Sequence, residues 1–331
     1  MATSGSGLSA QLGVAPEVTY GTIVAPTRFF ELADGGESLK LDADRIESTG
    51  LRAGRRTQHS GRVVINVKGA GGDLNFDVLT KDFGFWLKYC LGKVVTSQPA
   101  AGPAPTVYDH TGTIDDLTTA GSFTLQVGRP STDGTVRPFT YAGCMVTSWE
   151  FSVGVDGLLT LKMTVDAQRE DTATALAVAS YTAGAELHSF VGGLVTLAGS
   201  AYDVNELTLT GTNGLKTDRR FIRQSVLKKQ PLENAMREFG GNLSAEFGDF
   251  TPYNRFVNGT YATLQLKFEG SIIETTYKHT LQIDLPVVRF DGETPNLDGK
   301  DVVQQPLPFK VLDDGTAEPI TVLYRTTGAT P

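Results

Sequence analysis

The sequence predicts a mainly β protein built from antiparallel sheet. Runs in which apolar and polar residues alternate recur along the whole chain, and they are rich in β-branched and aromatic residues. Such alternation is typical of strands with one buried and one solvated face. Segments with helical spacing are few. The alternating runs are residues 38–42, 61–69, 122–128, 205–211, 263–270 and 279–285.

The clearest hairpin is expected over residues 145–167. Apolar and polar side chains alternate from Ser148 to Val153 in its first strand, and Asp156-Gly157 supplies residues that tolerate the positive φ of a tight turn. A second alternating strand follows. The face predicted to be buried carries Met145, Trp149, Phe151 and Val153, and the opposite face carries Ser148, Glu150 and Ser152.

Helices are expected in few places. Residues 77–92 carry apolar side chains at helical spacing, enough to cover one side of a sheet, and Gly92 is a reasonable stop. A shorter helix is expected over residues 251–259, where Pro252 suits the first turn. Residues 231–239 are a third candidate.

Composition excludes several functional classes. The chain has 331 residues, a net charge of −8, two cysteines and no apolar run of the roughly 18 residues that a membrane helix needs. The acidic balance argues against general nucleic-acid binding. No metal-ligand cluster, phosphate loop or nucleophile elbow is present, so we expect no cofactor, no metal and no enzymatic activity. A pair of carboxylates brought together by the fold stays possible.

A short glycine–arginine phrase occurs twice. Residues 49–56 read TGLRAGRR and residues 212–220 read TNGLKTDRR, with matching positions offset by 164. Each phrase follows one alternating run and precedes a strand, a helix candidate and a strand beginning Thr-Leu-Gln. The sequence therefore predicts a tandem duplication, with one unit at residues 1–175 and the other at residues 185–331.

The spacing of the two units differs by one insertion. The Thr-Leu-Gln strands are offset by only 139, whereas the glycine–arginine phrases are offset by 164. The first unit contains a segment rich in Pro, Gly, Ala and Thr, residues 96–120, whose length equals the difference between these two offsets. Surface loops tolerate such insertions, so we expect this segment to be a loop on the outer surface or rim.

Basic residues are concentrated around the two phrases. Residues 42–62 hold five Lys and Arg, and residues 210–237 hold seven, so these segments carry 12 of the 29 basic residues while the remainder is strongly acidic. Charge blocks are often only solvated surface. The alternative is that they dock on an acidic surface of another copy, a head-to-tail contact that propagates. The contact candidates are Arg52, Arg55, Arg56, Lys216, Arg219, Arg220 and Arg223.

The N-terminal segment resembles that of a known family. Residues 11–32 are similar to the opening of tail tube proteins of long-tailed (siphovirus-type) bacteriophages, and the resemblance continues to about Gly92. Beyond that point it rests on the order of elements and on the hairpin at 145–167. The matching residues are Gly13, Glu17, Thr19, Tyr20, Gly21 and Thr22.

The resemblance implies a structural virion protein. Its subunit would be a β-sandwich-like unit with a flanking helix, here duplicated, whose inner strands join those of neighbours into one closed barrel. Stacked rings would form a hollow tube around a tape measure protein, meet tail terminator and tail-tip proteins, and later pass double-stranded DNA. Assembly would occur in the host bacterial cytoplasm. The loop between the inner strands, where the basic segments lie here, would contact the adjacent ring.

The predicted duplication is compatible with two arrangements of chains in the ring. Three chains, each supplying two units, would imitate a sixfold ring, and six full chains are the alternative. Two other functions also compete: a low-copy ring of the tail tip or joining region, and a secreted β-sandwich carbohydrate-binding module or enzyme. Against the secreted module, the sequence shows no signal peptide of the expected kind and has only two Trp residues.

Overall fold

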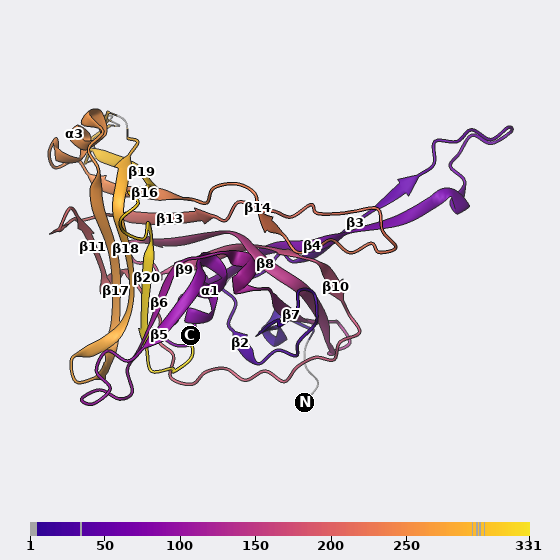
Figure 1. The fold of residues 1–331 in the computed structure, drawn as a ribbon, viewed down its shortest axis with the longest axis horizontal. Helices are drawn as coiled ribbons and strands as arrows, with labels where there is room; N and C mark the ends of the chain where they lie inside the picture. The colour runs from indigo at the N-terminus through magenta and orange to yellow at the C-terminus, as the bar shows by residue number, and fades with distance from the viewer. Residues whose placement is uncertain (1–4, 34, 293, 296, 298, 301) are drawn as a thin grey trace.

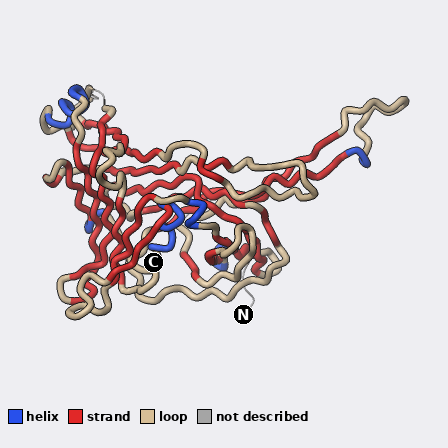
Figure 2. The backbone as a smooth tube through the Cα atoms, in the orientation of Figure 1, coloured by secondary structure: helices blue, strands red, loops and turns tan. Residues whose placement is uncertain are grey.

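Antiparallel strands dominate the computed structural model, which describes residues 5–331 except 34, 293, 296, 298 and 301 (Figures 1 and 2). This confirms the predicted fold class. The first part of the chain contains η1 (Gly7–Ser9), β1 (Gln11–Pro16), β2 (Arg28–Phe30), β3 (Lys40–Glu47), η2 (Ser60–Arg62), β4 (Val63–Asp77), α1 (Gly84–Leu91), β5 (Gly92–Ser97), β6 (Tyr108–Ile114), α2 (Leu117–Ala120), β7 (Phe123–Pro130), β8 (Val136–Gly154), β9 (Thr160–Ala167) and β10 (Arg169–Asp171).

The second part is built in a similar order. Its elements are η3 (Phe190–Gly192), β11 (Gly193–Leu197), β12 (Ser200–Ala201), β13 (Glu206–Thr212), β14 (Leu215–Lys216), β15 (Leu232–Glu233), β16 (Glu238–Glu246), α3 (Thr251–Asn258), β17 (Ala262–Glu274), β18 (Tyr277–Phe290), β19 (Gln304–Val311) and β20 (Thr321–Thr326).

One continuous sheet runs through both parts, in the order β3-β4-β9-β8-β13-β16-β19. Its centre is β8, where Glu150 lies opposite Lys162 of β9 on one side and Thr210 of β13 on the other. In Figure 1 the strands of this sheet run horizontally, and β17, β18 and β20 cross them at the left.

The same strand pairings occur twice. In the first part they are β1–β2, β1–β7, β7–β8, β8–β10, β8–β9, β4–β9 and β3–β4. In the second part they are β11–β12, β11–β17, β17–β18, β18–β20, β18–β19, β16–β19 and β13–β16. Helices α1 and α3 follow β4 and β16, respectively.

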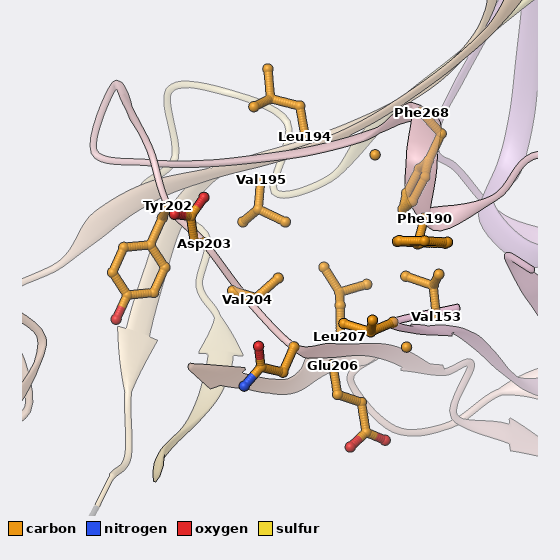
Figure 3. A pocket seen from close by; sticks show the side chains of 14 residues that line it. Val153, Phe190, Leu194, Val195, Tyr202, Asp203, Val204, Glu206, Leu207 and Phe268 are labelled. Carbon is orange, nitrogen blue, oxygen red and sulfur yellow. The ribbon is translucent and has the colours of Figure 1, made fainter. Parts of the chain in front are cut away.

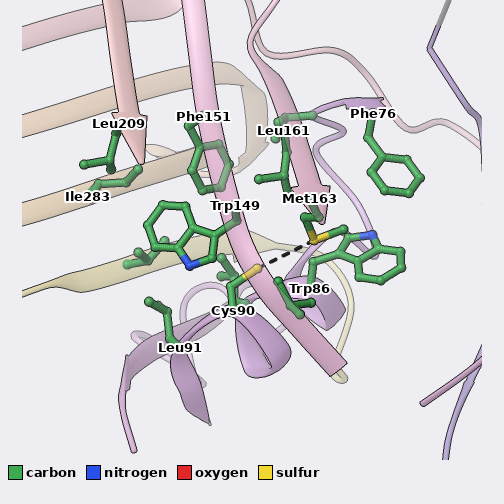
Figure 4. Packing of buried hydrophobic residues seen from close by; sticks show 14 of the residues in the cluster. Phe76, Trp86, Cys90, Leu91, Trp149, Phe151, Leu161, Met163, Leu209 and Ile283 are labelled. Atoms are coloured by element: carbon green, nitrogen blue, oxygen red, sulfur yellow. Dashed lines mark hydrogen bonds between the residues drawn. The ribbon is translucent and has the colours of Figure 1, made fainter. Parts of the chain in front are cut away.

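The hairpin predicted over residues 145–167 is confirmed as the last part of β8 paired with β9, and Asp156 at its turn has a φ of 63°. Trp149, Phe151 and Val153 are buried as expected. Figure 4 shows Trp149 and Phe151 packed with residues of β9 and α1, including Met163 and Cys90. Cys90 and Cys144 are free buried thiols, and burial raises the pKa of both.

The helix predictions are partly confirmed. Helix α3 lies where expected, with Pro252 in its first turn and Gly259 at its C-terminal cap. Helix α1 ends at Gly92 as expected but begins only at Gly84. Val78 bonds through its backbone to Leu159 and His188, and Asp82 has a φ of 60°, so the residues before Gly84 do not continue the helix. The candidate at residues 231–239 is wrong, since this segment contributes to β15 and β16.

The surface-loop expectation for residues 96–120 is wrong in part. Residues 108–114 form strand β6, which lies between β5 and β20 and so ties the first part of the chain to the last strand. Its polar residues are satisfied inside the sheet. The Asp109 carboxylate accepts from Arg325 Nε at 2.6 Å, and the His110 ring lies within hydrogen-bond distance of Thr96 Oγ1 and Gly328 O.

Candidate assembly surfaces

The hairpin formed by β3 and β4 projects far beyond the rest of the molecule (Figure 1, upper right). Residues 63–67 of β4 pair with β3 alone, since the pairing of β4 with β9 begins at Ala70. Exposed apolar side chains such as Ile46, Val64 and Ile65 lie on this extension. Exposed apolar side chains in a projecting hairpin are characteristic of an interaction surface.

The tip of this hairpin is the first basic loop, residues 48–62. Every residue in it is exposed, and it contains four arginines and no acidic residue. The side chains of Arg52, Arg55 and Arg56 make no hydrogen bond or ion pair within the described residues, and Leu51 is fully exposed at the turn. The tip therefore presents unpaired positive charge around one apolar side chain.

In the second basic loop, residues 213–237, the predicted contact residues bond to partners within the chain. Lys216 pairs with Asp218 at 2.9 Å, and Arg219 Nη1 donates to the Gln230 carbonyl at 2.6 Å. Arg220 Nη2 donates to Asn66 Oδ1 at 2.6 Å and to the Val67 carbonyl at 3.0 Å, so this loop lies against the base of the first hairpin. Arg223 Nη2 donates to the carbonyl of Leu227 at 2.7 Å.

The seven predicted contact residues therefore fall into two groups. Arg52, Arg55 and Arg56 lie together on the projecting tip. The other four lie on the second loop, where their charged groups already have partners within the chain.

Residues 7–311 match the family model described as phage tail tube protein. The chain belongs to this family. A comparison with curated proteins finds no match. Among the described residues, no helix of the tail tube protein combines the length and apolarity that crossing a membrane requires. The match identifies a structural protein of the phage tail tube, which is a component of the virion tail. Nothing in the described residues favours the two alternative functions, the tail-tip ring and the secreted module.

The N-terminal motif of the tail tube protein has a structural role. Glu17 is buried, and its carboxylate accepts four hydrogen bonds: from the backbone N–H groups of Gly21 and Gly143 at 2.9 Å each, from Ser122 Oγ at 2.6 Å and from Thr124 Oγ1 at 2.8 Å. A carboxylate with this many donors is strongly held. Glu17 thus fixes the N-terminal segment to β7 and β8.

A buried ion pair anchors the second basic loop of the tail tube protein. Lys228 Nζ contacts the Asp166 carboxylate of β9, and Gln168 Nε2 donates to the Lys228 carbonyl at 2.9 Å. Burial raises the pKa of Asp166, and Lys228 opposes that rise. In the sequence, Lys228 is only one of the seven basic residues of this segment. No local pattern marks it as buried, because its partners lie 60 or more residues away.

Proposed function

We propose that this tail tube protein forms closed rings that stack head to tail, and that each chain supplies two ring-forming units, residues 1–175 and 185–331. The recurrence of seven strand pairings in the two parts supports this division. The β8–β13 pairing, seven residues long, is then the junction between neighbouring units, formed here within one chain.

The observation that carries the proposal is a difference between β3 and its counterpart β13. Strand β13 is hydrogen-bonded on both sides, to β8 and β16, and its Leu209 is fully buried opposite Phe151. Strand β3 is bonded to β4 alone among the described strands, and its Leu41 is 42% exposed. Such an edge is a template for pairing with another chain.

The partner edge is at the other end of the sheet. Strand β18 corresponds to β8, and its last residues, Arg289 and Phe290, pair with β19 only among the described strands. Pairing of β3 beside this end of a neighbouring chain would continue the sheet from one chain into the next. A heterologous contact of this kind closes into a ring when its rotation closes, and closure removes both edges.

The ring we propose contains three chains and six units. Because both parts of the chain contain the same pairings, each can occupy one position of a pseudo-sixfold ring. Six full chains per ring, with one part lining the lumen and the other outside, is the alternative arrangement.

The lumen is proposed to be lined by the polar face of the continuous sheet. This face carries Glu150, Lys162, Thr208 and Thr210, whereas the opposite face is the apolar core. A neutral to acidic wall lets double-stranded DNA slide, because a basic wall would bind phosphates by counterion release. The tape measure protein would fill this lumen before ejection, and terminator and tip proteins would meet the two ends of the tube.

Electron microscopy with helical reconstruction tests the proposal. The purified chain is expected to form tubes whose rings each contain three chains. A Leu41→Asp variant should remain folded and monomeric, because it places a charge in the proposed junction. The matched control is Val178→Asp, which changes a 90% exposed side chain outside the strands. Six full chains per ring, or rings formed normally by Leu41→Asp, would contradict the model.

A further inference from the structure

The end of the molecule opposite the basic tip carries an apolar pocket of about 180 Å³ (Figure 3). Its lining comes from the end of β8, from η3 and β11, from the segment before β13, and from β17. Several of its apolar side chains are open to solvent, including Val155, Phe190 and Leu194. Its apolar lining includes Val153, Phe190, Leu194, Val195, Val204 and Phe268. We call this the end pocket.

A second, acidic hollow adjoins the end pocket, and the two share Tyr202, Asp203 and Asn205. Together they are lined by four exposed carboxylates and by no lysine or arginine. The Thr251 N–H donates to Asp249 and holds the pKa of that carboxyl below its usual range, so it stays ionised at neutral pH. The four acidic residues are Asp203, Glu206, Glu246 and Asp249.

The tip of the first basic loop has the complementary composition. It presents one fully exposed leucine, Leu51, beside Arg52, Arg55 and Arg56, with no acidic residue in residues 48–62. A cavity of about 150 Å³ lined by apolar side chains holds a benzene molecule, so the end pocket is large enough for a leucine side chain. The carboxylates beside it are placed to meet guanidinium groups.

We propose that the end pocket and its acidic hollow receive the tip of the first basic loop from a chain in the adjacent ring, with Leu51 in the pocket and the arginines on the carboxylates. The inference rests on the stacked rings proposed above and names the surface that the tip binds.

The placement of the two surfaces fits this contact. In Figure 1 the tip and the strands that form the pocket lie at opposite ends of the long axis, so a chain cannot fill its own pocket. A contact between different patches at opposite ends is heterologous and propagates along the axis. The exposed ion pairs are screened by salt, whereas burial of Leu51 is not, so tubes should weaken with salt but not dissolve.

A charge exchange tests the inference. Reversing the tip with Arg55→Glu/Arg56→Glu, or the hollow with Asp203→Lys/Glu246→Lys, should leave rings intact and shorten tubes at least tenfold. Combining all four changes should restore tubes, because the charges again match. The control is Asp313→Lys/Glu318→Lys, two exposed acidic residues outside both hollows, which should assemble normally.

Cross-linking provides an independent measurement. The Leu51→Cys/Leu194→Cys variant should give covalent ladders when tubes are oxidised, because a disulfide needs Cα atoms within about 7 Å. Leu51→Cys/Val178→Cys should give none, and the native cysteines are buried.

The outcomes separate the two proposals. Normal tubes from the hollow-reversed variant, or no rescue by the fourfold exchange and no ladder, would overturn the docking inference while leaving ring formation standing. Failure of the unmodified chain to form rings would instead contradict the proposed function.

Discussion

Lys228 and Asp166 form an ion pair that joins the two parts of the chain, with only 5% and 17% of their side chains exposed. Lys228 belongs to the second basic loop and Asp166 to β9, so the pair fixes this loop on the first part of the molecule. Its burial distinguishes it from exposed pairs such as Lys310–Glu238.

Removing Lys228 should therefore be costly. We expect Lys228→Ala to lower the free energy of unfolding by about 3 kcal/mol, because Asp166 is left buried without its partner. Burial already raises the pKa of Asp166, which means that the buried site disfavours the ionised carboxylate. The loss should be larger at pH 8 than at pH 5, where protonation of Asp166 relieves it.

Urea unfolding at the two pH values measures this effect. The control is Lys310→Ala, which breaks an exposed pair with Glu238 at 3.0 Å and should cost under about 1 kcal/mol at either pH. Equal losses for the two variants would show that burial of the Lys228 pair does not matter.

The two basic loops should respond differently to charge reversal. Arg219→Glu/Arg220→Glu should lower the melting temperature of the unassembled chain by several degrees, because these side chains donate to Gln230, Asn66 and Val67. Arg55→Glu/Arg56→Glu should leave it unchanged, because both side chains are exposed. Calorimetry of monomeric protein makes the comparison, and equal shifts would be inconsistent with the observed contacts.

His188 should make the fold sensitive to acid. Its ring is buried, and both ring nitrogens lack a hydrogen-bond partner within the described residues. Burial, and secondly the nearby His279, lower the pKa of His188 to about 4, while Glu186 opposes the shift.

The depressed pKa stabilises the fold above the ordinary pKa of histidine, and this contribution is lost as pH falls from about 6.5 to about 4. The loss amounts to roughly 3 kcal/mol. The slope of stability against pH should become shallower in His188→Leu, although other groups still titrate. His59→Leu, at an exposed position, should keep the original slope. An unchanged slope in His188→Leu would contradict the assignment.

Two deletions should distinguish the role of strand β6 from that of the loop within residues 96–120. Removing the whole segment should prevent folding, because β20 would lose β6 as its neighbour. Replacing residues 98–108 with Asn-Gly removes the first residue of β6 and the buried Ala104 and Val107. It should still allow folding, since Ser97 and Asp109 already face each other and the replacement is a favoured hairpin turn. Circular dichroism and assembly assays of both variants decide this. Folding of the full deletion would show that β6 is dispensable.

Local patterns predicted much of this fold. The hairpin at residues 145–167 and helix α3 are specified by alternation, turn residues and caps that all lie within the segments themselves, so the sequence alone reveals them. Strand β6 was not predicted, because Asp109 and His110 interrupt the alternation of apolar and polar residues along it. Their partners, Arg325 and Gly328, lie 216 and 218 residues away in the sequence, respectively.

The assembly surfaces were likewise predictable only where a local stretch of sequence marks them. Charge clustering located both basic loops, but the contact that separates their roles joins Arg220 to Asn66, 154 residues apart. The end pocket draws its lining from several distant segments, so no single stretch of sequence marks it.

Strand β8 has a mechanical consequence for the tube. It spans 19 residues, roughly 60 Å at the usual rise per residue, and it passes from pairing with β7 and β10 to pairing with β9 and β13. Its ladder bonds lie perpendicular to the strand, so tension along the strand loads many of them in shear at once. A pull on one part of the subunit is thereby carried directly into the other, without passing through the linker between them.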